Sequence, residues 1–225
     1  MSRGKLDRST LVWIAVLRMM AGYLSAVSFL LFSRTLAGHT GNLTKSMIHL
    51  AAGDYEQLVY IMSLTGSYFA GAVVSGWLDL RLTDQQPLQA TRVFMSLGIG
   101  LGLFMLWPSL EPGLIYYLSF VLGVQTGLKI SYHGHSVRIS FITGFLTEVG
   151  NLLGQRLRGA PLNHFKLCFN LANIFGFLLG ALLGAYIYQR PGLDPLLLAA
   201  LAMIAIGILE AIDQHRYQWF ETDLE

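Results

Sequence analysis

Residues 167–189 read LCFNLANIFGFLLGALLGAYIYQ, an apolar run without a single charged side chain. A membrane-spanning helix needs about 20 consecutive, largely apolar residues. Helix is the expected conformation because a lone strand would leave its backbone N–H and C=O groups unpaired in lipid. This stretch therefore predicts a transmembrane helix, and the same measure can be applied to the rest of the chain.

Five further stretches have the same character. Most of them carry no charged residue, whereas Arg18 interrupts the first and Glu210 lies near the end of the last. The five stretches are 10–32, 57–78, 93–107, 112–128 and 195–212. The sequence therefore predicts an all-α polytopic protein with six transmembrane helices, forming a single membrane domain over residues 1–225.

The composition excludes other classes of protein. Hydrophobic residues make up 54% of the chain and charged residues 12%, with a mean hydropathy of +0.54. Soluble proteins average about 25% charged residues, so no soluble domain is expected. The net charge is only +2 and no dense basic run exists, so we expect no nucleic-acid partner. Cys168 is the single cysteine, which excludes an intrachain disulfide.

The distribution of Lys and Arg predicts the orientation. If the N-terminus is cytoplasmic, the inside segments hold eleven of these residues and the outside segments hold three. The outside residues are Arg34, Lys45 and Arg190. Cytoplasmic loops carry the excess of positive charge in membrane proteins. We therefore expect a multi-pass protein with both termini in the cytoplasm.

Two connections differ from ordinary loops. Segments 33–56 and 131–166 are long, partly apolar and rich in Gly and Thr. The pattern Thr-Gly-x-Leu-Thr occurs in both, at residues 40–44 and 143–147, and each copy opens an amphipathic stretch. We expect two short helices here, either re-entering the membrane or lying flat at its interface.

Small residues also recur in the two halves of the chain. They are spaced by four at Ser67, Gly71 and Ser75, and again at Gly176, Gly180 and Gly184. Ala21-Gly22 likewise parallels Thr126-Gly127. This spacing lets helices approach closely in lipid and also suits a homo-oligomer. Because each half has three spans, the pattern predicts an inverted internal repeat with halves 10–110 and 112–212.

Several of these motifs resemble the YoaK family, whose members are small bacterial membrane proteins of unknown function. The similarity rests on Ala21-Gly22 with Ala26, His39-Thr40-Gly41-Asn42, Ala52-Gly53-Asp54, Gly123-Val124-Gln125 and Thr143-Gly144. The resemblance implies a place in the bacterial inner membrane and implies no reaction or ligand. Ser25 stands where the family usually has an Asp shortly after the first Ala-Gly.

The Thr-Gly segments are the candidate binding site. A helix N-terminus exposes backbone N–H groups and partial positive charge, which can hold an anion or a substrate carboxylate. In an inverted repeat two such ends can approach each other near the middle of the bilayer. With the two amides of the fifth span, the candidates are His39, Thr40, Gly41, Asn42, Thr44, Thr143, Gly144, Thr147, Asn170 and Asn173.

Other polar residues have competing interpretations. An intramembrane charge often marks function, yet the long side chain of Arg18 could also reach the cytoplasmic face or pair with Glu210. Asn170 and Asn173 share a helical face and would either bond neighbouring helices or line a solute pathway. His133-Gly134-His135 lacks companion ligands, so we expect no metal site and no cofactor.

These observations favour a protein of the lipid bilayer that moves or binds a small-molecule or anionic solute. The alternative is a membrane structural, assembly or sensing component whose Gly-rich helices only pack. The sequence has no His-Glu-x-x-His, Gly-x-Ser-x-Gly or P-loop motif, so we do not expect an enzyme.

Overall fold

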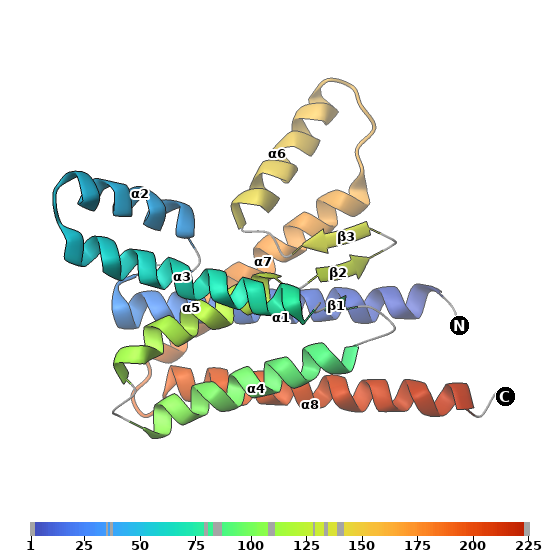
Figure 1. Cartoon of the computed structure of the whole chain (residues 1–225). Coiled ribbons are helices and arrows are strands. Elements are labelled where there is room, and N and C mark those ends of the chain that lie inside the picture. The colour runs from blue at the N-terminus through green and yellow to red at the C-terminus, as the bar shows by residue number, and fades with distance from the viewer. Residues whose placement is uncertain are drawn as a thin grey trace.

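The computed structural model describes residues 3–34, 36, 38–78, 81–82, 87–107, 111–127, 129–132, 135–138 and 142–222. These residues form eight helices and three short strands (Figure 1). In order they are α1 (Arg3–Phe32), α2 (His39–Ala51), α3 (Tyr55–Trp77), β1 (Arg81–Leu82), α4 (Pro87–Leu106), α5 (Glu111–Gly127), β2 (Lys129–Tyr132), β3 (His135–Arg138), α6 (Ile142–Leu157), α7 (His164–Tyr188) and α8 (Pro195–Thr222).

The predicted apolar stretches are all helical, as α1, α3, α4, α5, α7 and α8. Three segments are long and apolar enough to cross a membrane, namely Ala15–Phe32, Tyr55–Trp77 and His164–Tyr188. Shorter apolar segments lie at Arg92–Leu106 and Pro195–Leu209. The all-α membrane class is therefore confirmed at the level of three candidate spans.

A small sheet joins two of the connections. β1 pairs in parallel with β2, and β2 pairs antiparallel with β3, placing Arg81 beside Lys129 and Lys129 beside Arg138. The all-α prediction contains no strands, so this sheet is an addition to the predicted fold. Such brief strands carry too few residues to leave a period-two pattern. His133 and Gly134 of the His-Gly-His motif lie outside the described residues.

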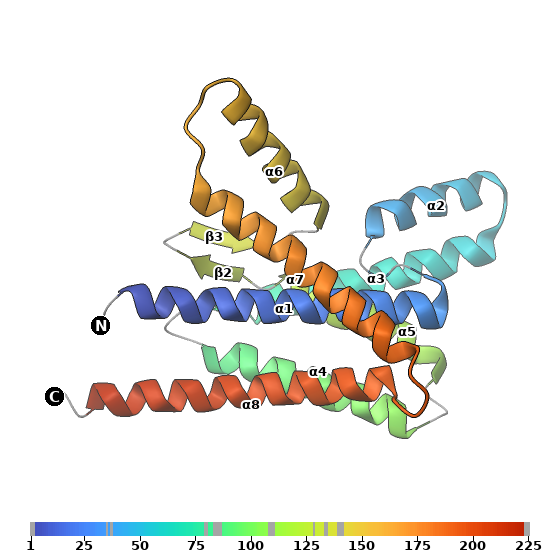
Figure 2. The ribbon, with the colours of Figure 1, turned by 180° about the vertical axis from the view of Figure 1, so that it is seen from behind.

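The long helices lie side by side in pairs (Figures 1 and 2). α1 packs against α7, α3 against α5, and α4 against α8. The short helices are placed alike, because α2 packs on α3 and α6 packs on α7. Both chain ends lie at the same end of the helical array. Buried aliphatic side chains such as Leu17, Leu64, Leu101 and Leu118 form the core between the pairs.

The outer surface of the array is apolar. Phe69, Phe175 and Leu182 are each at least 64% exposed, and Trp77 and Trp107 are exposed at the ends of their helices. A water-soluble protein rarely exposes so many large apolar side chains. Lipid is the solvent that this surface suits, which agrees with the candidate spans.

Glycines bring the backbones of α1 and α7 into direct contact. A Cβ atom added at Gly22 would collide with the carbonyl oxygen of Phe177. A Cβ atom added at Gly180 would collide with the carbonyl oxygen of Met19. Close approach of this kind is what small residues at helix interfaces allow in lipid.

The crossing of α3 and α5 is built in the same way. A Cβ atom at Gly71 would meet the carbonyl oxygen of Phe120, and one at Gly123 would meet that of Tyr68. The predicted role of Gly71 and Gly180 in close helix packing is therefore confirmed. The glycine of α5 that makes the closest contact is Gly123 rather than Gly127, which meets the side chain of Ser75.

Candidate functional site

The first Thr-Gly segment places the start of α2 beside the middle of α3. His39, the first residue of α2, has its Nδ1 3.5 Å from the Oγ1 of Thr65. Its ring lies 4.1 Å, centroid to centroid, from the ring of Tyr68. Thr65 is ten residues beyond the start of α3 at Tyr55, which is about 15 Å along a helix. That distance is about half the thickness of a hydrocarbon core.

Five polar side chains gather here, which we call the His39 cluster. They are His39, Asn42 and Ser46 of α2 together with Thr65 and Tyr68 of α3. The three from α2 are buried, and Ser46 donates to the carbonyl oxygen of Asn42. Thr65 donates to the carbonyl oxygen of Ile61, which leaves its oxygen free to accept the Nδ1 proton of His39.

His39 keeps one ring nitrogen unused. Its Nε2 is buried and has no hydrogen-bond partner among the described residues. Burial lowers the pKa of His39 below its ordinary value, against a smaller opposite effect of the Leu36 backbone. The imidazole is therefore held neutral, with Nε2 as a buried acceptor that a bound N–H or O–H group can use.

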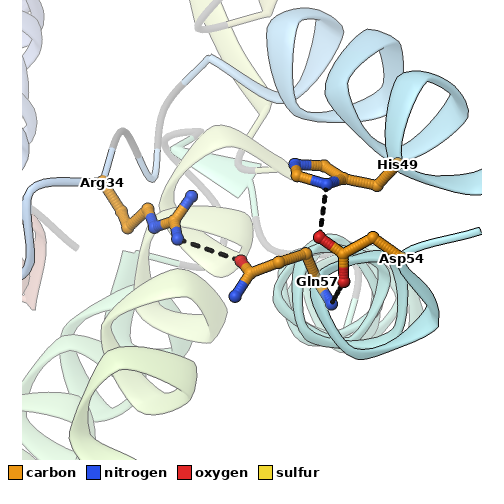
Figure 3. A network of polar contacts seen from close by, with 4 residues as sticks. All are labelled: Arg34, His49, Asp54 and Gln57. Atoms are coloured by element: carbon orange, nitrogen blue, oxygen red, sulfur yellow. Dashed lines mark hydrogen bonds and ion pairs between the residues drawn. The ribbon is translucent and has the colours of Figure 1, made fainter. Parts of the chain in front are cut away.

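Figure 3 shows how the α2–α3 hairpin is fixed. Asp54 accepts from the backbone N–H of Gln57 at the start of α3, and its other oxygen lies 3.0 Å from His49 Nδ1. Gly53 makes the turn with a φ of +74°, a conformation that glycine adopts without strain. Arg34 donates to the side chain of Gln57, so the segment before α2 is tied to α3 as well.

An open hollow of about 550 Å³ lies beside this hairpin. Arg34, Glu56, Gln57 and Tyr60 line it together with Tyr116 of α5. The guanidinium of Arg34 lies 5.5 Å from the ring of Tyr60, close enough for a cation–π contact. The hollow is thus a polar and aromatic surface at the start of α3, next to the hairpin turn.

The second Thr-Gly segment opens α6 beside α1 and α7. The guanidinium carbon of Arg18 lies 4.7 Å from the ring centre of Phe145, the fourth residue of α6. Arg18 Nε donates to Asn173 Oδ1 over 2.9 Å, and Asn173 Nδ2 donates to the carbonyl oxygen of Phe169. We call Arg18, Phe145 and Asn173 the Arg18 cluster. Asn170 lies about one turn before Asn173 on α7 and donates to the carbonyl oxygen of Lys166.

Arg18 is buried, with only 4% of its surface exposed. Its Nη2 is buried and has no hydrogen-bond partner among the described residues. The side chain thus bonds Asn173 instead of extending to the surface, as snorkelling would require. The side chain of Glu210 lies outside the described part of α8, so the expected pair with Arg18 stays a prediction.

The structure divides the predicted site residues into two groups. His39 and Asn42 lie in one cluster, and Asn173 lies in the other. Asn170 lies about one turn before Asn173 on α7, and all four are buried. The remaining candidates, Thr40, Gly41, Thr44, Thr143, Gly144 and Thr147, lie on exposed faces of α2 and α6. α2 packs on α3 and α6 packs on α7. A joint site formed by the two Thr-Gly segments stays a prediction.

The threonine hydroxyls serve their own helices. Thr44 donates to the carbonyl oxygen of Thr40, and Thr147 donates to that of Thr143. This bond to the residue four positions earlier is common for Thr in helices. The predicted use of these hydroxyls as donors to a solute gains no support from their geometry.

Sequence reasoning missed several contributors to the clusters. Thr65, Tyr68 and Phe145 join only through tertiary contacts, and no local pattern marks them. Gln125 of α5 is also buried, and its Nε2 donates to the carbonyl oxygen of Leu17, next to Arg18. Within the described part of the chain, no group of His, Cys, Asp and Glu has the arrangement of a metal site.

Comparison with known proteins places the chain in a family. The family model described as "Protein of unknown function (DUF1275)" matches residues 13–209. No curated protein and no solved structure matches the chain. The sequence-based expectation of a family of unknown function is therefore confirmed, while the narrower resemblance to YoaK stays a prediction.

Proposed function

Since the chain belongs to the DUF1275 family, whose function is unknown, we propose a function from its own residues. It is an integral inner-membrane protein that moves or binds a small solute and performs no enzymatic chemistry. Six helices span the bilayer, and two short helices re-enter it. The buried polar clusters beside the starts of α2 and α6 form the solute path.

Matching contacts at the helix crossings support an inverted repeat. A shift of 101 residues carries α1 onto α5, and a shift of 109 residues carries α3 onto α7. With these shifts, the contact of Gly22 with Phe177 corresponds to the contact of Gly123 with Tyr68. The contact of Gly180 with Met19 corresponds in the same way to that of Gly71 with Phe120. Corresponding helices also run in opposite directions (Figure 1), as an inverted repeat requires.

The position of α2 supports a re-entrant helix rather than an interfacial one. His39 is buried at the level of the middle of α3, and α2 runs back toward the start of α3 at Tyr55. Phe145 places the first turn of α6 against Arg18, a residue of the candidate span Ala15–Phe32. Irregular backbone at membrane depth is tolerated where it is buried in protein or lines a cavity.

The arrangement of the helices supports six spans with both termini in the cytoplasm. α4 and α8 have 20 and 28 residues and pack against each other, and α5, with 17, lies along the candidate span α3. The two chain ends lie at one end of the array, and the Lys and Arg excess falls on the same side.

One observation favours transport over a packing role. Buried polar groups are costly in a membrane protein, and those that remain usually face a pathway or each other. Here Arg18 Nη2, His39 Nε2 and Gln125 Oε1 are buried without hydrogen-bond partners among the described residues. The runner-up, a structural, assembly or sensing component, is supported by the glycine crossings, which make a rigid bundle.

Flux through vesicles tests the proposal. Purified protein is reconstituted into vesicles, which are shrunk with glycerol, urea, potassium acetate or potassium phosphate, and volume recovery is followed by light scattering. At least one solute should enter faster than into protein-free vesicles. His39→Ile should slow that entry, because it removes the buried, unpartnered Nε2 of the His39 cluster. Equal recovery in all four solutes, with and without protein, would favour the packing role.

A further inference from the structure

Arg18 presents a buried positive charge without a described counter-charge. Among the described side chains, the recorded ion pair joins His49 to Asp54 and does not involve Arg18. Asn173, which accepts from Arg18 Nε, is a neutral amide. A buried charge without a partner costs several kcal/mol, so a lone guanidinium at this depth needs an anion.

The start of α6 adds positive potential at the same place. Helix N-termini carry a partial positive charge and unbonded N–H groups. Arg18 lies over Phe145, in the first turn of α6, and that turn contains no acidic residue. A cation against a helix N-terminus is unfavourable by itself, whereas an anion between the two is favoured by both.

Packing does not require the charge. By the same shifts of 101 and 109 residues, Arg18 and Asn173 correspond to Ser119 and Leu64 at the α3–α5 crossing. There the hydroxyl of Ser119 donates to the carbonyl oxygen of Leu64, and the crossing is equally close. One crossing thus closes with a neutral contact where the other holds a guanidinium.

We propose that Arg18, Asn173 and the first turn of α6 form a binding site for a small oxyanion, a carboxylate or a phosphate group. Arg18 supplies the charge through the buried Nη2 edge, and Asn173 holds the guanidinium by its Nε edge. Phe145 covers one face of the guanidinium and excludes water. This site deepens the proposed function by naming its solute class, and it rests on that function only for the step of transport.

Equilibrium binding tests the site directly. Protein in a non-ionic detergent is titrated with [14C]acetate and with [32P]phosphate by scintillation proximity. We expect saturable binding of at least one probe. Arg18→Gln removes the charge and should weaken binding at least tenfold. If no probe binds and the lipid experiment below also fails, or if Arg18→Gln binds the probe as the parent does, the proposal is overturned.

Asn173→Asp provides a second variant that keeps Arg18 in place. The new carboxylate would pair with Arg18 over the existing 2.9 Å contact and compete with the external anion. We expect a higher unfolding temperature without anion and at least tenfold weaker binding. Asn163→Asp is the matched control, because it makes the same change at the exposed start of α7, where the side chain still accepts from Lys166 N–H. Unchanged binding in Asn173→Asp would contradict the proposal.

An experiment with added lipid distinguishes a free oxyanion from the phosphate of a lipid headgroup. If neither free probe binds, the unfolding temperature is compared with and without dioleoylphosphatidylglycerol. A rise in the parent that is absent from Arg18→Gln assigns the site to a lipid phosphate and retains the oxyanion chemistry. No rise in the parent, with no binding of the free probes, overturns the site.

An internal counter-charge would also overturn it. If Glu210 were the partner, Arg18→Gln would lower the unfolding temperature, and adding Glu210→Gln would restore it. An additive effect of the two changes supports an external anion. Failure of the site and failure of transport are distinguishable. If acetate binds but no flux is found, transport is contradicted and the binding site is retained. If flux is found and Arg18→Gln does not change it, the binding site is contradicted and transport is retained.

Discussion

Arg18 and Ser119 occupy corresponding places at two similar helix crossings, yet their surroundings differ in charge. Arg18 bonds the amide of Asn173, whereas Ser119 bonds the backbone of Leu64. The crossings themselves are closed by glycines against carbonyl oxygens in both cases. Close packing of the helices therefore depends on the small residues, and the guanidinium is an addition to one crossing that packing does not need.

The starts of the two short helices also differ, and here the polar residues lie on the helix of the first half. With the 103-residue shift of the Thr-Gly pattern, His39 and Asn42 of α2 correspond to Ile142 and Phe145 of α6. The His39 cluster thus has a neutral, polar helix start, while the other half has an apolar helix start against a charged Arg18. In the proposed inverted repeat, the two halves therefore carry different polar groups at equivalent positions, so the two sides of the proposed solute path differ chemically.

The largest effect is predicted for replacing the glycines that close both helix crossings. Gly22→Ala and Gly123→Ala each place a Cβ against a carbonyl oxygen of the facing helix, which cannot move without the whole helix. We expect each change to lower the free energy of unfolding by about 1 to 3 kcal/mol, measured by thermal unfolding in detergent.

Gly66→Ala on α3 is the matched control for these glycine changes. No atom lies within 4 Å of its Cβ position, and alanine is the better helix former by about 1 kcal/mol. We therefore expect this control to leave stability unchanged or to raise it. A large loss at Gly22 with none at Gly123 would show that the two crossings are not equivalent.

The next largest effect is predicted for a double substitution that gives the two crossings the same residues. In the double variant Arg18→Ser with Asn173→Leu, the α1–α7 crossing copies Ser119 and Leu64. Replacing a buried charge network by well-packed neutral groups is often neutral for stability. We expect an unfolding temperature close to that of the parent and at least tenfold slower uptake of [14C]acetate into vesicles. A strong loss of stability would instead assign Arg18 to packing.

Much of this architecture could be predicted from the sequence because its signals are local. Apolar runs gave the long helices, and the predicted end of the first stretch, Phe32, is the last residue of α1. The Thr-Gly pattern located the starts of α2 and α6 within three residues. Small residues spaced by four identified the faces that pack, since helical period and side-chain size suffice for that inference.

The composition of the clusters could not be predicted, because it depends on tertiary contacts between distant segments. Arg18 and Asn173 are 155 residues apart, and the local sequence around either residue does not predict their hydrogen bond. The threonines illustrate the converse. Thr44 and Thr147 stand in a conspicuous motif, yet each hydroxyl bonds its own helix. A repeated motif can thus mark a helix start without marking a ligand contact.

A smaller effect compares the two hairpins that carry the short helices. Asn163 caps α7 through Lys166 N–H, while Asp54 caps α3 and also pairs with His49. We expect Asn163→Ala to cost about 1 kcal/mol of unfolding free energy. Asp54→Ala should cost slightly more, because a half-exposed pair adds between about 0 and 1 kcal/mol.

Asp54→Asn isolates the ion pair in that hairpin, since an asparagine oxygen still caps the helix. The unfolding temperatures of these three variants, measured under one set of conditions, give the order of the effects. Equal losses in Asn163→Ala and Asp54→Ala would assign no stability to the contact with His49.

The smallest predicted effect is a pH dependence confined to the His39 cluster. Burial lowers the pKa of His39, so between the depressed value and the unfolded value of 6.5 only the unfolded chain takes up the proton. Stability must therefore fall as pH drops below about 6.5 and level off below the folded pKa, since each unit of depression corresponds to about 1.4 kcal/mol. His39→Ile copies Ile142 and leaves the Thr65 hydroxyl bonded to Ile61. Unfolding temperatures of parent and variant, measured from pH 5 to 7.5, should diverge only on the acid side. Parallel curves would mean that His39 takes up its proton as easily in the fold as in the unfolded chain.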